Sequence, residues 1–201
     1  MKKIIKVLIV ILSICTLIIG GFFWLLVGSY ERISRDIDHY EADLQQISNA
    51  SKLMPKLDSV NGCTDINYTY KIRCYSTLAG FYSDAFALFI TYDQNQYNTI
   101  KGKILSGYDF LEKPVMRSSD TYELPVAEFE YKGYYFKIVP DKEYIDYCAC
   151  KSFMLIGFND ETSRIVYMYY YDFDIDYIAE VGDDLEQQMC ELIDTAFAWV
   201  E

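Results

Sequence analysis

Residues 165–171 read Ile-Val-Tyr-Met-Tyr-Tyr-Tyr, a run that is apolar or aromatic at every position. A strand with one face in solvent alternates apolar and polar residues, so an unbroken apolar run indicates a strand that is covered on both faces. We therefore expect residues 165–171 to form a central strand, with other strands paired on both sides of it.

Short strands joined by turns surround this run in the sequence. Residues 66–74 alternate apolar and polar side chains, and Lys132-Gly133 suits a tight hairpin turn. The predicted strands are, in chain order, 66–74, 85–92, 126–131, 134–139, 153–158 and 164–171. Because short connections favour antiparallel neighbours, the sequence predicts an α+β fold with a mostly antiparallel sheet of about six strands.

Two amphipathic helices complete the predicted domain, which we assign to residues 56–201. Asp93 and Gln96 match a capping box at the start of one helix, and Gly107 suits its C-terminal cap. The other helix is expected from about Asp184 to Val200. Its predicted buried stripe consists of Leu185, Met189, Leu192, Ile193, Ala196, Phe197 and Val200.

The N-terminal segment has a different character. After Lys2, Lys3 and Lys6, residues 7–30 carry no charged side chain. As a helix this segment measures about 36 Å, longer than the roughly 30 Å hydrocarbon core of a bilayer. The sequence therefore predicts a single-pass transmembrane helix, a signal anchor, at residues 7–30 and a short cytoplasmic N-terminus at residues 1–6.

Two alternatives for this segment stay open. It could be a signal peptide cleaved after Ser29, although such peptides usually have an apolar core of only about 7–15 residues. Residues 12–15, Leu-Ser-Ile-Cys, resemble a lipoprotein motif, but Ile14 is bulky where that motif needs a small residue. The lysines ahead of the segment favour a cytoplasmic N-terminus, which places residues 31–201 outside the cytoplasm at the cell membrane.

Residues 31–55 are expected to form a helical stalk between the membrane and the domain. Apolar side chains recur there at alternating spacings of four and three, the pattern of a coiled-coil seam. They are Ile33, Ile37, Tyr40, Leu44 and Ile47. Such a seam could join two copies of the chain in a weak homodimer. We prefer the alternative that the apolar stripe packs on the chain's own domain.

The charge of the chain argues against nucleic acid as a partner. The 201 residues include 30 acidic and 18 basic side chains, which gives a formal net charge of −12. Nucleic-acid phosphates are bound by Lys and Arg, so an acidic domain repels them. All the acidic residues follow the N-terminal segment, which makes the part assigned to the outside strongly negative.

The residues also argue against an enzyme. The single His, His39, lies in the expected stalk, so the domain has no histidine for a Ser-His-Asp or Cys-His system. Glycine-rich phosphate-binding motifs and the G-x-S-x-G nucleophile motif are absent from the sequence. We expect a non-enzymatic binding or accessory module of the cell envelope, with no cofactor and with an unknown protein or glycan partner. The alternatives are a hydrolase that uses two carboxylates on envelope glycans and a structural subunit of a membrane complex.

One acidic cluster is a weak candidate for calcium. Its members fall at positions 1, 3, 5, 9 and 12 of an EF-hand-like loop and are Asp172, Asp174, Asp176, Glu180 and Asp183. Tyr177 stands where that loop needs Gly. We expect instead an extended segment whose acids face water while Phe173, Ile175 and Tyr177 face inward.

The five cysteines beyond the membrane segment leave the disulfide state open, because an odd number cannot all pair within one chain. Cys63 and Cys74 could close a small loop. Cys148 and Cys150 are too close in sequence to pair without strain. Cys190 is expected in the core, where a free thiol packs as a small apolar group.

Overall fold

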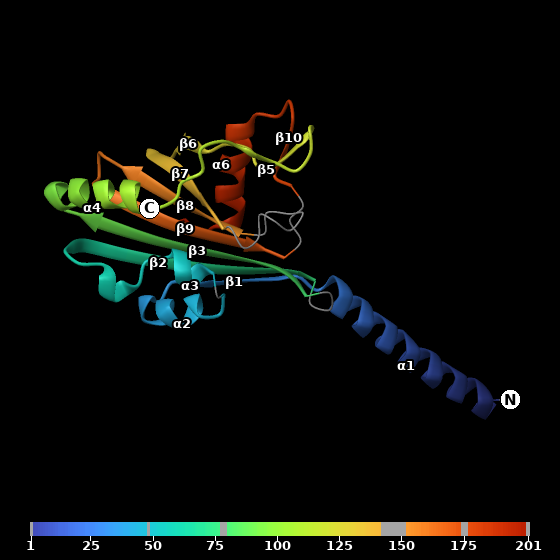
Figure 1. Ribbon diagram of the computed structural model, residues 1–201. Coiled ribbons are helices and arrows are strands. Elements are labelled where there is room, and N and C mark those ends of the chain that lie inside the picture. The colour runs from blue at the N-terminus through green and yellow to red at the C-terminus, as the bar shows by residue number, and fades with distance from the viewer. Residues whose placement is uncertain (1, 48, 77–79, 142–151, 174–176, 200–201) are drawn as a thin grey trace.

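The computed structural model describes residues 2–47, 49–76, 80–141, 152–173 and 177–199. Within the first helix it describes the side chains of Ile5, Lys6 and residues 9–23. A long N-terminal helix projects from a body built on a seven-stranded sheet whose paired strands are all antiparallel (Figure 1). The predicted α+β class and mostly antiparallel sheet are confirmed.

The large sheet has the strand order β1-β2-β3-β9-β8-β7-β6. Its members are β1 (Tyr30–Ser34), β2 (Cys63–Ser76), β3 (Phe81–Tyr92), β6 (Glu128–Tyr131), β7 (Tyr134–Pro140), β8 (Ser152–Asn159) and β9 (Arg164–Asp172). Strand β9 is the fourth of the seven, and residues 165–170 in it are all buried. The unbroken apolar run therefore forms the central strand, as predicted.

The six predicted strands are all present, and β1 is the seventh. At the hairpin between β6 and β7, Lys132 and Gly133 have φ angles of 49° and 76°. Two successive positive φ angles are what a two-residue hairpin turn of this kind requires. A second sheet, which the sequence did not predict, has the order β10-β5-β4, with β10 (Ala179–Glu180), β5 (Thr121–Leu124) and β4 (Val115–Met116).

The two predicted helices are α4 (Gln94–Gly107) and α6 (Leu185–Ala196). The Asp93 carboxylate accepts a hydrogen bond from the Gln96 backbone N–H at 2.9 Å, and Asp184 caps α6 in the same way. The capping box is only half formed, because the Gln96 side chain donates to the Asn61 carbonyl instead. Helix α6 also ends four residues earlier than expected, with Phe197 in extended backbone.

The sheet separates two hydrophobic cores. One contains alternate side chains of β2, β3 and β9, such as Tyr70, Phe86 and Tyr169, and is covered by α4 and by the segment around residues 37–60. The other contains the intervening side chains of β3 and β9, such as Phe89 and Tyr170, together with buried residues of α6. The sheet is thus buried on both faces at its centre, which is why β9 lacks polar alternation.

The prediction of a helical stalk over residues 31–55 is wrong. This segment contains strand β1, a 3-10 turn (Ile37–His39) and two short helices, α2 (Tyr40–Leu44) and α3 (Ala50–Leu53), followed by a 3-10 turn (Leu57–Ser59). Strand β1 pairs with β2, with Tyr30 opposite Cys74. A pairing with a strand about 40 residues away supplies ladder hydrogen bonds that local periodicity does not reveal.

The apolar stripe of this segment packs mainly on its own domain, which confirms the preferred alternative. Tyr40 and Leu44 are buried in the core on the α4 side of the sheet, and Ile37 and Ile47 pack against that core. The Tyr40 hydroxyl also donates a 2.6 Å hydrogen bond to the Pro55 carbonyl. Ile33 is separated from the others because it lies on β1, where it is exposed. The continuous seam expected along one helix face is therefore not formed.

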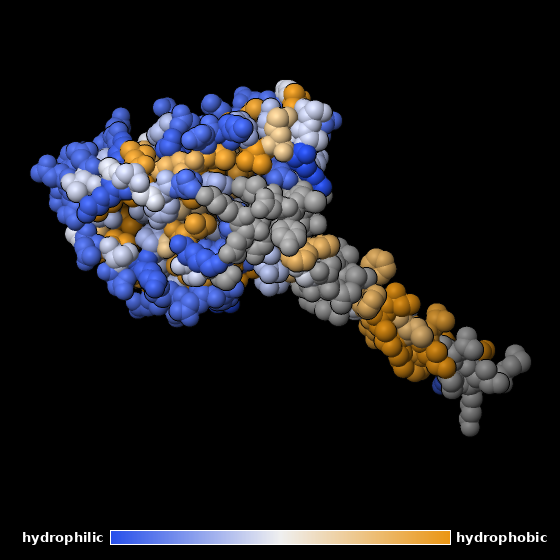
Figure 2. Space-filling model, in the orientation of Figure 1, coloured by the Kyte–Doolittle hydropathy of each residue, from blue (hydrophilic) through white to orange (hydrophobic). Residues whose placement is uncertain are grey.

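Helix α1 (Lys2–Val27) extends away from the sheet (Figure 1). Its described apolar side chains are exposed, Leu17 to the extent of 75%, and its surface is the most continuously hydrophobic part of the view in Figure 2. Among the helices of the described residues, none has the length and apolar character that a membrane crossing requires.

Candidate functional site

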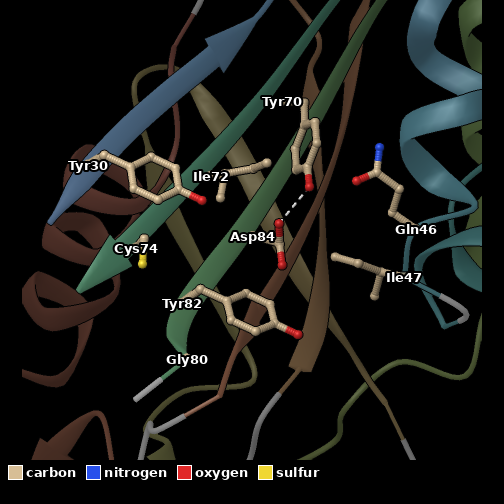
Figure 3. A pocket seen from close by; sticks show the side chains of 9 residues that line it. All are labelled: Tyr30, Gln46, Ile47, Tyr70, Ile72, Cys74, Gly80, Tyr82 and Asp84. Carbon is tan, nitrogen blue, oxygen red and sulfur yellow. Dashed lines mark hydrogen bonds between the residues drawn. The ribbon is translucent and has the colours of Figure 1, made fainter. Parts of the chain in front are cut away.

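A pocket of about 400 Å³ lies at the end of the sheet nearest α1 (Figure 3). Strands β1, β2 and β3 form one wall, and the chain just after α2 forms the opposite one. It is lined by Tyr30, Gln46, Ile47, Tyr70, Ile72, Cys74, Gly80, Tyr82 and Asp84. Its volume is at the small end of the range for pockets that hold small molecules.

The polar centre of the pocket is the carboxylate of Asp84. This side chain is only 3% exposed and accepts a 2.6 Å hydrogen bond from the Tyr70 hydroxyl. The Tyr70 ring stacks on Phe86, with 4.2 Å between ring centroids. Figure 3 shows the second carboxylate oxygen pointing away from Tyr70 toward the space beside Tyr82. One oxygen is therefore held by the fold, and the other faces the pocket.

Burial controls the electrostatics of this site. Loss of solvent raises the pKa of Asp84 to about 6, with the Asp172 charge adding to the rise and the Tyr70 hydrogen bond opposing it. Burial also raises the pKa of the Tyr70 hydroxyl, as does the hydrogen bond that this hydroxyl donates to the Asp84 carboxylate. Tyr70 therefore stays neutral and remains a donor while Asp84 ionises near neutral pH.

The described lining residues contain no Lys or Arg, and Asp84 is their only carboxylate. Arg32 instead lines an adjoining smaller pocket together with Asp43. Asp172 is buried at the same end of the sheet but on the opposite face. There it accepts a 2.7 Å hydrogen bond from the Tyr170 hydroxyl, much as Asp84 does from Tyr70. The pocket thus presents one carboxylate among aromatic rings, an arrangement suited to binding.

The expectation that Asp172 faces water and that Phe173 and Tyr177 face inward is wrong. Asp172 is buried, whereas Phe173 and Tyr177 are 42% and 47% exposed. Asp172 is the last residue of β9 and is held inside by its hydrogen bond from Tyr170, so the predicted order of outward acids and inward aromatic rings is reversed. These residues therefore do not form the simple extended acidic face that the sequence suggested.

The remaining calcium candidates are divided among different places. Glu180 lies in β10, and its backbone N–H donates to the Asp183 carboxylate at 3.0 Å. Asp174, Ile175 and Asp176 lie outside the described residues. In the part of the chain that the structure describes, no three His, Cys, Asp or Glu side chains are grouped to hold a metal ion.

Cys63 and Cys74 do not close the small loop that the sequence left open as a possibility. Both are free thiols on the same strand, β2, and their separation of eleven positions corresponds to roughly 36 Å. Cys190 is a free thiol buried in the core beside Met189 and Ile193, as expected, and burial raises its pKa. Cys148 and Cys150 lie outside the described residues.

Sequence reasoning did not identify Asp84 or Tyr70 as site residues. The available signal was an acid just before the predicted strand 85–92, opposite a strand with Tyr70 on its apolar face. Recognising the pair requires the register of β2 against β3, which the sequence does not specify. The chain matches no family model, no curated protein and no solved structure, so the site stands on its geometry.

Proposed function

We propose that this protein is a single-pass, membrane-anchored binding module with its N-terminus in the cytoplasm and its domain outside. The observation that carries the proposal is the uncharged run of the sequence, and in the structure α1 leads into the sheet after only two intervening residues. The proposed span at residues 7–30 rests on the uncharged run of the sequence, part of which lies outside the described side chains.

The end of the domain next to α1 is rich in exposed aromatic rings, which supports a position close to the bilayer. Tyr30, Tyr75, Tyr82 and Phe173 are between 37% and 52% exposed. The register groups them at one end, because Tyr30 is opposite Cys74 and Cys74 is opposite Tyr82. Phe173 joins them through a hydrogen bond from its backbone N–H to the Tyr82 carbonyl. Amphipathic rings of this kind favour the membrane–water interface.

The pocket at this end supports binding more than catalysis. A glycosidase of the usual kind needs two carboxyl groups flanking one bond. Among the described lining residues only Asp84 supplies a carboxyl group, and Asp172 is separated from it by the sheet. A reactive thiol needs a nearby base, and the one histidine, His39, is on the 3-10 turn outside the lining. A binding site requires only shape and suitable polar groups.

Protease protection tests the topology. Full-length protein with a C-terminal epitope is expressed in bacteria, and protease is added to spheroplasts before and after detergent lysis. We expect loss of the epitope in intact spheroplasts and survival of a short N-terminal fragment. A protected epitope that is lost only after lysis would place the domain inside and overturn the proposal.

Alkaline carbonate extraction tests the anchor itself. The double variant Leu17→Arg/Ile18→Arg puts two charges at the centre of α1, where each costs about 2.5–3.5 kcal/mol to insert. It should leave the membrane pellet, whereas the native chain stays there. Leu105→Arg is the matched control, since Leu105 is 43% exposed on α4 and a charge there should not change extraction. Equal extraction of all three proteins would count against the anchor.

Photo-crosslinking in membranes followed by affinity capture tests the binding role. A reproducible partner that is lost in Asp84→Asn supports a binding module that uses this pocket. Absence of a partner, together with turnover of envelope glycans that Asp84→Asn abolishes, would instead support a carboxylate-dependent hydrolase. A partner retained by every domain variant but lost when α1 is altered would support a structural subunit of a membrane complex.

A further inference from the structure

We propose that the pocket around Asp84 binds an organic cation, an ammonium group carried by a small amine or by a lipid headgroup. The inference deepens the proposed binding function and rests on it. Its starting point is a buried carboxylate with no cation in the described lining of its own pocket, since Arg32 lines the adjoining pocket together with Asp43. Buried carboxylates are normally paired with a cation or neutralised, yet the described lining of this pocket contains no Lys or Arg.

The walls of the pocket suit an ammonium group. Tyr30, Tyr70 and Tyr82 line the same pocket as the Asp84 carboxylate, Tyr70 with its hydroxyl toward the carboxylate and one ring face stacked on Phe86. The negative face of such a ring attracts a cation within about 6 Å, and aromatic cages with a nearby carboxylate recognise alkylammonium groups. The Gln46 amide on the opposite wall offers an acceptor and donors for the polar remainder of a ligand. Ile47 and Ile72 supply apolar contact for methyl groups.

An inorganic cation fits less well. Calcium takes six to eight oxygen ligands and magnesium demands six in near-octahedral geometry. The described lining residues offer one carboxylate, of which Tyr70 already occupies one oxygen. An ammonium group needs only one such oxygen together with aromatic faces, which matches what the pocket presents.

Two sources could supply this chemistry. Tyr30 lines the pocket, is the first residue of β1 and is the last residue of the proposed membrane span. The pocket could therefore be reached by a phosphatidylethanolamine headgroup from the membrane as well as by a free amine from solution. The shared feature is the ammonium group, and lipid composition separates the two sources.

Calorimetric titration of the full-length chain in uncharged detergent tests the proposal at a pH of about 8, where Asp84 is ionised. Choline chloride is the probe. The first control is 3,3-dimethylbutan-1-ol, which has the shape of choline without its charge, and sodium chloride keeps the ionic strength constant. We expect saturable choline binding at least about tenfold tighter than binding of the neutral alcohol, a difference that reports the charge.

Two carboxylate variants locate the binding. Asp84→Asn keeps the side-chain shape and the hydrogen bond from Tyr70 but removes the charge, so we expect choline affinity to fall by at least about tenfold. Asp172→Asn is the matched control, because it removes a buried charge at the same sheet end on the opposite face. It should change affinity by less than about twofold. Tyr82→Ala, at the exposed rim, should weaken binding without altering the core.

The titration has clear contrary results. Equal binding of choline and the neutral alcohol, unchanged affinity in a folded Asp84→Asn, or no saturable binding below roughly 10 mM would each overturn the proposal. If Asp84→Asn fails to fold, as judged by circular dichroism, Tyr82→Ala decides the matter. A partner captured in membranes despite a failed titration would leave the binding function standing and remove only the cation.

Nanodiscs distinguish the two sources. If a headgroup occupies the pocket, choline should bind at least about threefold more weakly in phosphatidylethanolamine discs than in phosphatidylglycerol discs, because a tethered ligand competes at high local concentration. If the ligand is a free amine, the two lipid compositions should give the same affinity. Either result supports an ammonium site and assigns its source.

Discussion

The Tyr70 hydroxyl reaches diagonally across the β2–β3 ladder to donate its hydrogen bond to Asp84. The residue directly opposite Tyr70 is Phe86, on which the Tyr70 ring stacks, while Asp84 is opposite Ile72. The stacked ring is thus held in a direction that aims its hydroxyl at the carboxylate, at 2.6 Å. Packing and hydrogen bonding together position the one acid in the pocket lining.

Removing this hydroxyl should destabilise the fold. In Tyr70→Phe the buried Asp84 carboxylate loses the hydrogen bond that the structure gives it, at an expected cost of about 1–3 kcal/mol at neutral pH. Urea unfolding of the detergent-solubilised full chain measures the change. Tyr82→Phe is the control, since Tyr82 is partly exposed at the pocket rim. Equal stabilities of the two variants would contradict this role for Tyr70.

The raised pKa of Asp84 predicts how stability depends on pH. The pKa of Asp84 is about 6 in the folded chain and 3.8 as its ordinary value. Between these two pH values the folded chain keeps the Asp84 proton, whereas the unfolded chain has already lost it. The resulting stabilisation is complete below about pH 4 and disappears as the pH rises through about 6. Relative to the native protein, Asp84→Asn should therefore gain up to about 3 kcal/mol between pH 4 and 7. Asp58→Asn, at an exposed site, is the control for removing an acidic side chain.

Two glycines should respond oppositely to alanine. A Cβ at Gly157 would lie 2.5 Å from Phe136 and 2.8 Å from Val166, inside the packed centre of the sheet. Gly157→Ala should thus cost about 1–3 kcal/mol or more through overpacking. In α4, Gly102 has nothing within 4 Å of such a Cβ, and Gly102→Ala should stabilise by about 0.5–1 kcal/mol. Thermal melting that ranks them the other way would refute this packing argument.

Calcium should have little effect on stability. Asp172 is committed to a buried hydrogen bond with Tyr170, which leaves it poorly placed for the expected loop. A micromolar site at 1 mM free calcium would add roughly 4 kcal/mol by mass action. We expect a change in melting temperature below about 2 °C between calcium and chelator at constant ionic strength, which is well short of that gain. A large shift that Asp183→Ala abolishes would restore the calcium site.

The elements that could be predicted from sequence are those whose signal is local. The unbroken apolar run at residues 165–171 indicates burial on both faces, and Asp93 identifies the start of α4 through its own capping bond. The segment from Tyr30 to Leu53 was misassigned because apolar spacings of three and four also fit two short helices beside a strand. What fixes β1 is its pairing with β2, a contact between residues distant in the chain.

The site could not be predicted for the same reason. Its residues come from β1, the chain just after α2, β2 and β3, and only the register brings Asp84 near Tyr70. A sequence with 30 acidic residues gives no means of choosing one of them. The cue that matters is burial of a carboxylate, and burial is a property of the assembled sheet.

The short passage from α1 into β1 has a mechanical consequence. Only two residues separate Val27 from Tyr30, and the helix extends away from the sheet at the end where β1 begins (Figure 1). Tension along α1 would therefore reach β1 at its first residue, and the component along β1 would load its five register pairs with β2 together, in shear. A strand loaded in this way resists force collectively, whereas one peeled from its end yields bond by bond. The domain would follow the tilt of its helix closely and would not swing on a loose tether.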